Sequence, residues 1–247
     1  MRFRRLSPHI RATAATLVLS GFLGISLSGQ TSLTNEITDM LRDELDLDRI
    51  AVTLVDTEAT LAGEVPTLWD KTRAINQTLA VEGVETLVSE ITIPGGEDDN
   101  DLAGQVGQAI RTYRFMTIWD YVGGGVEDGV VTLTGAVSPE RDKGADLFER
   151  IAKIRGVQDI QLQVVQQSSS RMDTNLRQRI ASQALRHPTL SHYNLVADIP
   201  PFRIVVDESV VMLVGAVRSG TESRVLESIA RQAFETGEVI NRLQYPQ

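Results

Sequence analysis

The chain has 247 residues, of which 33 are acidic and 24 are basic, and its formal net charge is −9 at pH 7. It contains no cysteine, which excludes disulfide bonds, thiolate metal sites and a thiol nucleophile. The acidic balance argues against nucleic-acid binding, because that function requires a basic stripe or patch.

The N-terminus has the pattern of a secretory signal peptide. Arginines at positions 2, 4, 5 and 11 form a basic start, and no charged residue occurs from Ala12 to Asn35. The apolar run LVLSGFLGISLSG ends in small residues, which predicts a cleaved signal peptide over 1–29. An uncleaved anchor is the alternative, although the most apolar stretch, 12–27, is shorter than the roughly 20 residues that span a bilayer. Export without disulfides is more typical of a bacterial envelope than of a eukaryotic secreted scaffold.

One sequence pattern then occurs three times. The runs ATLAGEV, VTLTGAV and VMLVGAV lie at 59–65, 131–137 and 211–217, and each alternates like a β-strand before a glycine. A helix-like stretch follows each run, and a second glycine comes 20 to 22 residues after the first. The glycine pairs are Gly63 with Gly83, Gly135 with Gly156, and Gly215 with Gly237. Matching spacing in three places indicates one small supersecondary unit used three times.

Each unit is predicted to contain five elements. Apolar residues at helical spacing begin at Leu33, Leu102 and Leu176, near the N-cap residues Thr34, Asp101 and Asp173. Two strands follow, over 50–55 and 59–65, 118–122 and 130–137, and 202–206 and 210–217. A second helix is predicted over 68–79, 140–154 and 222–234, and a last strand over 84–93, 157–165 and 239–243. The second glycine of each pair stands where a left-handed C-cap is needed.

These elements predict an α+β fold. The strand–helix–strand connection of each unit is expected to cross over in the right-handed sense, which makes the sheet mixed and places the helices on one face. We therefore predict three tandem αββαβ units, each a mixed three-stranded sheet packed against two helices. Unit 1 covers 31–94, unit 2 covers 102–167 and unit 3 covers 173–247. An acidic linker at 95–101 and the polar run QQSSSR at 166–171 separate them.

The units resemble a known family. The run GVVTLTGAV at 129–137, with a helix that ends in IAKIRGVQDIQLQV, is similar to the BON domain, named for bacterial osmotic-stress and nodulation proteins. ESVVMLVGAV at 208–217 repeats the pattern in unit 3, and unit 1 resembles it less closely. Unit 1 departs at Glu64 and Pro66, and unit 3 departs at Glu238, which splits the usual Gly-Val pair.

The resemblance implies a periplasmic or envelope-associated binding module that attaches to phospholipid surfaces and supports the envelope under osmotic stress. The resemblance implies no catalytic residues. The six glycines are expected to serve turn geometry and close helix–sheet packing, without contacting a ligand.

No set of residues in the sequence forms a catalytic or metal centre. His187 and His192 are five residues apart, which matches neither a zinc protease nor a zinc finger. The glycine-rich run VGGGVEDG at 122–129 lacks the Lys-Ser/Thr of a phosphate loop and is expected to be a hairpin connection. The four acids within 97–101, three of them contiguous, favour a solvated linker over a calcium loop. We therefore expect no enzyme activity, no cofactor, no metal and no small-molecule substrate.

Two groups of residues are candidates for binding a lipid surface. In unit 2 these are Arg111, Arg114, Phe115 and Trp119, and in unit 3 they are Arg177, Arg179 and Arg186. Arginines beside aromatic rings suit an anionic headgroup layer, since the cations are attracted to it and the rings sit at its boundary. The alternative is that the aromatic residues belong to the core and the arginines solvate their helices.

The leading hypothesis is an exported, non-enzymatic adaptor that binds anionic phospholipid through units 2 and 3. The alternative is a periplasmic protein–protein scaffold whose open sheet edges accept a strand from an envelope protein, with the acidic unit 1 selecting a basic partner. Nucleic acid is not expected as a partner.

Overall fold

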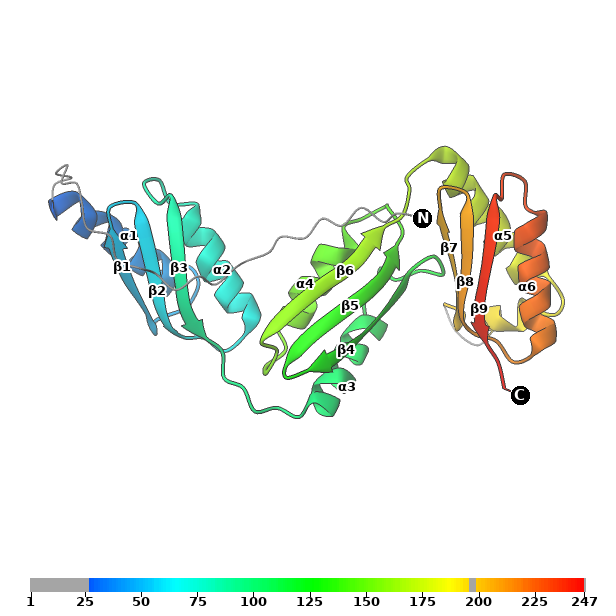
Figure 1. The fold of residues 1–247 in the computed structure, drawn as a ribbon, viewed down its shortest axis with the longest axis horizontal. Coiled ribbons are helices and arrows are strands. Elements are labelled where there is room, and N and C mark those ends of the chain that lie inside the picture. The colour runs from blue at the N-terminus through cyan, green and yellow to red at the C-terminus, as the bar shows by residue number, and fades with distance from the viewer. Residues whose placement is uncertain (1–26, 196–198, 247) are drawn as a thin grey trace.

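The computed structural model describes residues 27–195 and 199–246, so nearly all of the predicted signal peptide lies outside the described residues. Within these ranges, a unit of helix, two strands, helix and strand occurs three times along an extended molecule (Figure 1). No helix of the described ranges is both long enough and apolar enough to cross a bilayer.

The bounds of the elements are similar in the three units. Unit 1 contains α1 (Leu27–Asp43), β1 (Ile50–Val55), β2 (Glu58–Glu64), α2 (Leu68–Leu79) and β3 (Thr86–Thr92). Unit 2 contains α3 (Asp99–Arg111), β4 (Tyr121–Glu127), β5 (Val130–Val137), α4 (Lys143–Ala152) and β6 (Asp159–Gln166). Unit 3 contains α5 (Arg171–Arg186), β7 (Phe202–Asp207), β8 (Val210–Ala216), α6 (Gly220–Gln232) and β9 (Glu238–Gln244), with a short 3₁₀ helix η1 (Ser191–Leu195) after α5.

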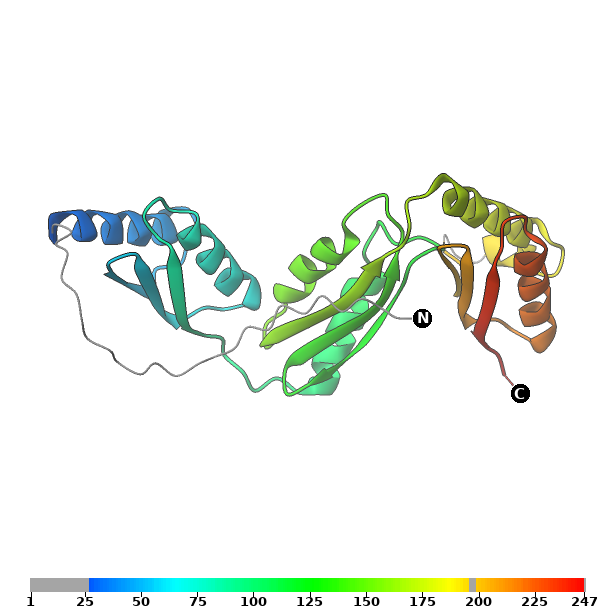
Figure 2. The same ribbon diagram turned by 45° about the horizontal axis from the view of Figure 1, so that its top comes forward.

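Each unit is a mixed three-stranded sheet. The middle strand pairs antiparallel with the strand before it and parallel with the strand after the second helix, in the orders β1-β2-β3, β4-β5-β6 and β7-β8-β9. The two helices of each unit cover one face of its sheet (Figure 2). The predicted fold class, α+β with three repeated units, is confirmed.

Two predicted boundaries in unit 2 were wrong. Helix α3 begins within the predicted acidic linker, because the Asp98 carboxylate caps it and accepts hydrogen bonds from the amides of Asn100 and Asp101 at 2.8 and 3.3 Å. Strand β4 runs through residues 123–125, which the sequence assigned to the hairpin connection. The turn is instead Asp128-Gly129, with φ of 51° and 74°, as the two-residue hairpin turn requires. Glycines carry no side chain and give no alternation, so the pattern could not reveal their strand.

The first glycine of each pair allows one backbone to approach another closely. A Cβ on Gly135 would lie 1.9 Å from the carbonyl oxygen of Tyr121. One on Gly63 or Gly215 would lie 2.2 or 2.3 Å from the carbonyl oxygen of the residue just before β1 or β7, which is Arg49 or Pro201. Gly83 and Gly156 adopt the predicted left-handed conformation, with φ of 99° and 88°. Gly237 does not, and Glu235 takes the left-handed position with φ of 78°. The structural role predicted for Gly237 as a C-cap was therefore wrong.

An aspartate clamps the hairpin turn in two of the units. In unit 2 the Asp99 carboxylate accepts hydrogen bonds from the amides of Asp128 and Gly129 at 2.8 and 3.0 Å. In unit 3 Asp173 accepts hydrogen bonds from the amides of Glu208 and Ser209 at 3.2 and 2.9 Å. The first turn of the opening helix is thereby fixed to the tip of the hairpin.

The buried apolar residues form two cores. One core extends through units 1 and 2, where α2 packs against α4 and Lys153 Nζ lies 5.3 Å from the ring centre of Trp69. The other core belongs to unit 3, and Ile118 and Trp119 of unit 2 pack against it. Unit 2 therefore contacts both of its neighbours, by different means on each side.

Candidate functional site

Several arginines gather around two aromatic rings where α3 ends and α4 runs beside it. Tyr113 and Phe115 follow the last turn of α3 and stack edge to face, with ring centres 5.6 Å apart. The guanidinium carbons of Arg114 and Arg141 lie 4.5 and 4.4 Å from the centre of Phe115, and that of Arg150 lies 5.7 Å from Tyr113. We call Tyr113, Phe115, Arg114, Arg141 and Arg150 the unit 2 cluster.

The charges of the unit 2 cluster are only partly neutralised. Asp146 forms an ion pair with Arg141 and accepts a hydrogen bond from the hydroxyl of Tyr113. The hydrogen bonds from Arg141 and Tyr113 lower the pKa of Asp146, while burial and the bond to Asp146 raise the pKa of Tyr113 to about 12. Arg114 and Arg150 are exposed and, among the described residues, have no carboxylate partner. Arg114 thus remains available beside the half-buried ring of Phe115. Arg150 lies beside the buried ring of Tyr113 and donates hydrogen bonds to the Ala109 carbonyl and the Thr112 hydroxyl at 3.3 and 3.1 Å.

Sequence reasoning found only part of this cluster. Arg114 and Phe115 lie in it as predicted neighbours, whereas Arg111 lies on the other side of α3, in a groove against β4. Arg141 and Arg150 come from the loop before α4 and from α4 itself, more than 25 residues away along the chain. No local signal in the sequence pointed to either arginine, because both reach the cluster only where α4 packs beside α3.

A second basic site with an exposed ring lies between α5 and α6 of unit 3. Arg179 is half-buried, donates a hydrogen bond to the Phe234 carbonyl at 3.1 Å, and holds its guanidinium 6.0 Å from the Phe234 ring centre. Phe234 is 74% exposed, the most exposed large apolar side chain among the described residues. Arg179 and the exposed Arg186 line a shallow groove of about 650 Å³. The sequence predicted the two arginines but not Phe234.

The prediction that Arg177 faces a lipid surface was wrong. Its side chain is 1% exposed, and it donates hydrogen bonds to the side chain of Gln167 and to the backbone carbonyls of Ser168 and Val206. Burial lowers the pKa of the Arg177 guanidinium, although nearby carboxylates oppose this effect. The helical pattern of α5 gave no sign of this burial, because β7 and the segment before α5 enclose Arg177.

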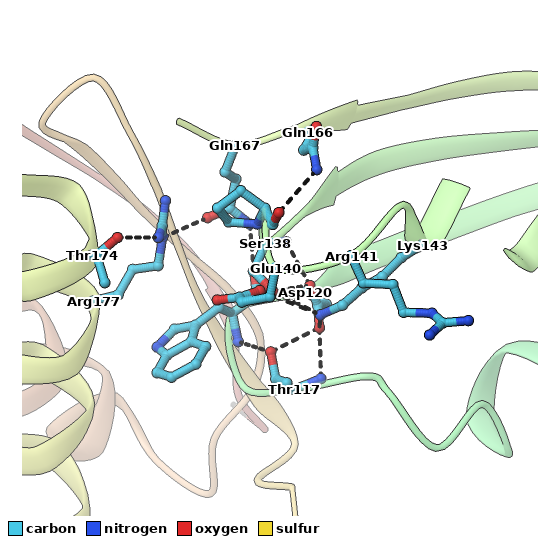
Figure 3. A network of polar contacts seen from close by, with 12 residues as sticks. Thr117, Asp120, Ser138, Glu140, Arg141, Lys143, Gln166, Gln167, Thr174 and Arg177 are labelled. Carbon is cyan, nitrogen blue, oxygen red and sulfur yellow. Dashed lines mark hydrogen bonds and ion pairs between the residues drawn. The ribbon is translucent and has the colours of Figure 1, made fainter. Parts of the chain in front are cut away.

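Trp119 also lies between units 2 and 3, so the prediction that it contacts headgroups was wrong as well. It packs against the core of unit 3, and its carbonyl accepts a hydrogen bond from Gln167 Nε2 at 2.7 Å. Gln167 Oε1 in turn accepts a hydrogen bond from the amide of Val206 at 3.0 Å. Figure 3 shows this arrangement of Gln167 and Arg177 between the two units.

A buried ion pair supports the same region from within unit 2. Lys143 Nζ lies 2.7 Å from Asp120 Oδ2, and the two side chains are 3% and 0% exposed. Asp120 also accepts hydrogen bonds from the amides and hydroxyls of Thr117 and Ser138, at 2.6 to 3.0 Å (Figure 3). Lys143 Nζ is 2.7 Å from Ser138 Oγ, as in a Ser–Lys nucleophile pair, but Ser138 is fully buried and beyond the reach of a substrate. The network therefore stabilises the fold of unit 2 beside its junction with unit 3.

The residues described by the structure contain no group of three or more His, Asp or Glu side chains that could hold a metal ion. His187 Nδ1 accepts a hydrogen bond from the amide of Thr189, and His192 stacks on Tyr193 with ring centres 4.1 Å apart. Both histidines are thus engaged by their local surroundings.

Comparison with known proteins identifies the family of one unit. Residues 31–95 match the model of the BON domain family. Units 2 and 3 repeat its topology. A comparison with curated protein sequences gives no match. Among solved structures, the chain is similar to two of CdsD, a structural protein of the type III secretion system of Chlamydia trachomatis. Both matches have 12% identity and a TM-score of 0.24, and they cover 88% and 87% of this chain and 99% and 94% of those chains.

Proposed function

We propose that this protein is a non-enzymatic binding protein of the bacterial envelope that attaches to anionic phospholipid surfaces and supports envelope integrity under osmotic stress. Support comes from the BON domain of residues 31–95 and from the repeat of its topology in units 2 and 3. The observation that carries the proposal is the unit 2 cluster, where Arg114 and Arg150 flank Phe115 and Tyr113 without a carboxylate partner among the described residues.

The chemistry of the cluster suits a headgroup layer. A phosphate accepts hydrogen bonds from a guanidinium, and a half-buried ring fits the boundary between headgroups and acyl chains. Each arginine near an anionic surface contributes about 1 kcal/mol. Because the chain as a whole is acidic, binding is expected to be weak unless several sites act together. The groove of Arg179 and Arg186, with the exposed Phe234 beside it, is the second contact in this proposal.

Co-sedimentation of residues 30–247 with liposomes tests the proposal. We expect binding that increases with the fraction of anionic lipid and weakens between low and moderate salt, because exposed charges are screened within about 10 Å at 0.1 M salt. Replacing Arg114 and Arg150 with glutamate should lower the binding constant about tenfold or more. The matched control replaces Arg171 and Arg224 with glutamate and should retain more of the binding, because both are exposed and neither belongs to the unit 2 cluster or lines the groove of Arg179 and Arg186.

Binding that ignores lipid charge and salt, or that both double variants weaken equally, would contradict the lipid site. Absence of binding to every liposome would favour the protein–protein scaffold, and a stoichiometric envelope protein should then be recovered with the chain.

A further inference from the structure

The groove between α5 and α6 of unit 3 contains a histidine that the proposed lipid contact does not use. The groove has a volume of about 650 Å³, and the charged or titratable residues that line it are Arg179, Arg186 and His187. The other lining residues are uncharged: Ser182, Gln183, Pro188, Ile229 and Gln232. Among the described residues the lining therefore contains no carboxylate, although the chain has 33 acidic residues.

The end of α5 fixes the position of His187. Residues 179, 182, 183 and 186 recur at a spacing of three or four and therefore share one face of the helix. His187 is the C-cap residue, and its amide donates hydrogen bonds to the carbonyls of Gln183 and Ala184 at 3.0 and 3.1 Å. Its Nδ1 accepts a hydrogen bond from the amide of Thr189 at 3.2 Å. A neutral ring bonded in this way carries its hydrogen on Nε2, which is left to donate to a ligand.

The acidic residues of α6 and of the segment after it do not line the groove. Glu222 lies 3.7 Å from His192 Nε2, and Glu227 pairs with Arg231 at 2.7 Å. Glu235, beyond the end of α6, is not part of the lining either. No ion pair of the described residues includes either arginine of the groove or its histidine. Within the described groove, the full charges that face the histidine are therefore those of the two arginines.

A protonated His187 would be the third cation of the groove. The free carbonyls at the end of α5 attract this charge, whereas the two arginines repel it, and a proton on Nδ1 would replace the bond from Thr189. An anionic group bound among three cations offsets the repulsion between them. By thermodynamic linkage, an anion that binds more tightly to the protonated groove also makes the proton bind more tightly.

We propose that His187 is a third binding residue of this groove and makes attachment to anionic phospholipid depend on pH. The inference rests on the proposed function and adds the regulation of its second contact. Histidine is the side chain whose charge ordinarily changes between pH 5 and 8. The groove then presents three cations to headgroup phosphates in mildly acidic conditions and two in mildly alkaline conditions. Binding therefore weakens as the pH rises through this range.

The composition of the chain makes this dependence measurable. Of the three histidines, only His187 and His192 lie within residues 30–247. We expect co-sedimentation of this chain with phosphatidylglycerol liposomes to give a dissociation constant about fivefold lower at about pH 5.5 than at about pH 7.5, the effect of one added cation at an anionic surface. The phosphodiester of this lipid keeps its charge at both pH values, and the ionic strength is held constant.

Three variants assign the dependence to one residue. His187→Gln stays uncharged and should bind equally at both pH values, with the affinity of the wild type at the higher pH. His187→Lys is charged at both and should bind about fivefold more tightly than the wild type at the higher pH. His192→Gln is the matched control and should retain the full dependence, because His192 does not line the groove. Circular dichroism of each variant at both pH values verifies the fold.

The outcomes separate this inference from the proposed function. A pH dependence in His187→Gln equal to that of the wild type would overturn the role of His187 and leave lipid binding in place. Loss of the dependence in His192→Gln would overturn it too. Absence of binding to the liposomes at both pH values would contradict the proposed function, and the inference with it.

The reciprocal measurement follows the proton instead of the lipid. NMR of the imidazole ring gives the midpoint pH of the His187 titration with and without soluble short-chain phosphatidylglycerol. The lipid should move this midpoint to higher pH and leave that of His192 unchanged. An unchanged His187 midpoint in the presence of bound lipid would overturn the proposal. An equal shift with inorganic phosphate would also overturn it, because the groove would then take a free anion and not a lipid headgroup.

Discussion

The two junctions between units look alike in sequence and differ in structure. The chain from unit 1 to unit 2 passes through 94–98, which is exposed, and its contact with unit 2 includes a single hydrogen bond from Gln158 Nε2 to the Pro94 carbonyl at 3.2 Å. The chain from unit 2 to unit 3 passes through Gln167, which is 3% exposed and bonded to both units. Polar composition alone does not distinguish a solvated linker from a buried joint. The difference lies in whether the neighbouring unit supplies hydrogen-bond partners.

The consequence is a difference in coupling. Units 1 and 2 meet through side chains of α2 and α4, a contact that includes the Lys153–Trp69 pair. Units 2 and 3 meet through backbone groups of β7 that have no other partner, so separation would leave the Val206 and Ile204 amides unpaired unless water replaced the lost bonds. We expect units 2 and 3 to move and unfold together more closely than units 1 and 2.

The largest loss of stability is expected from Asp120→Ala, which removes the carboxylate at the centre of the buried network beside the junction of units 2 and 3. The change leaves Lys143 buried without its counter-ion and Thr117 and Ser138 without their acceptor. Removing one partner of a buried ion pair costs about 3–5 kcal/mol. Urea unfolding measures this loss. Glu140→Ala is the control, because its carboxylate is 53% exposed and 3.9 Å from Lys143. Equal losses from the two variants would show that the buried pair contributes nothing beyond a surface charge.

A smaller loss of stability is expected from Gln167→Ala, and it should affect only the junction of units 2 and 3. The amide of Val206 and the guanidinium of Arg177 each lose an acceptor, at about 1–3 kcal/mol for each buried group left unpaired. Unit 3 should then unfold separately from unit 2 and become cleavable by protease within 167–171. Gln166→Ala is a close control, since Gln166 is exposed and its side chain donates only to the Pro139 carbonyl. Equal cleavage of the two variants would contradict a rigid junction between units 2 and 3.

The sequence predicted the architecture but not the contacts between units. Repeat spacing and alternation identify elements locally, and for this reason the αββαβ order and the left-handed Gly83 and Gly156 could be predicted. Arg177 carried no local sign of burial, because the residues that enclose it belong to β7 and to the segment before α5. Arg150 joined the unit 2 cluster only through the packing of α4 beside α3. Contacts of this kind depend on where whole elements lie.

The smallest loss of stability is expected at the tip of the β7–β8 hairpin, beside the junction of units 2 and 3. Here Asp207 accepts a hydrogen bond from the amide of Ser168 at 2.7 Å. Asp173 holds this tip, and although burial opposes it, hydrogen bonds from Ser168, Ser209 and Ser170 lower the pKa of Asp173. A carboxyl group with a lowered folded-state pKa stabilises the fold at pH values above its ordinary value, about 3.9, and this contribution is lost as the pH falls through the folded-state pKa. Asp173→Asn should therefore cost about 1 kcal/mol at pH 7 and make the stability of unit 3 less dependent on pH in the acid range. Glu208→Gln removes a charge from the same turn without removing a hydrogen bond and serves as the control. Thermal unfolding at pH 7 and at pH 3 measures this dependence. If it is the same for Asp173→Asn as for the wild type, Asp173 does not act through its charge. Gln167 alone would then distinguish the junction of units 2 and 3 from that of units 1 and 2.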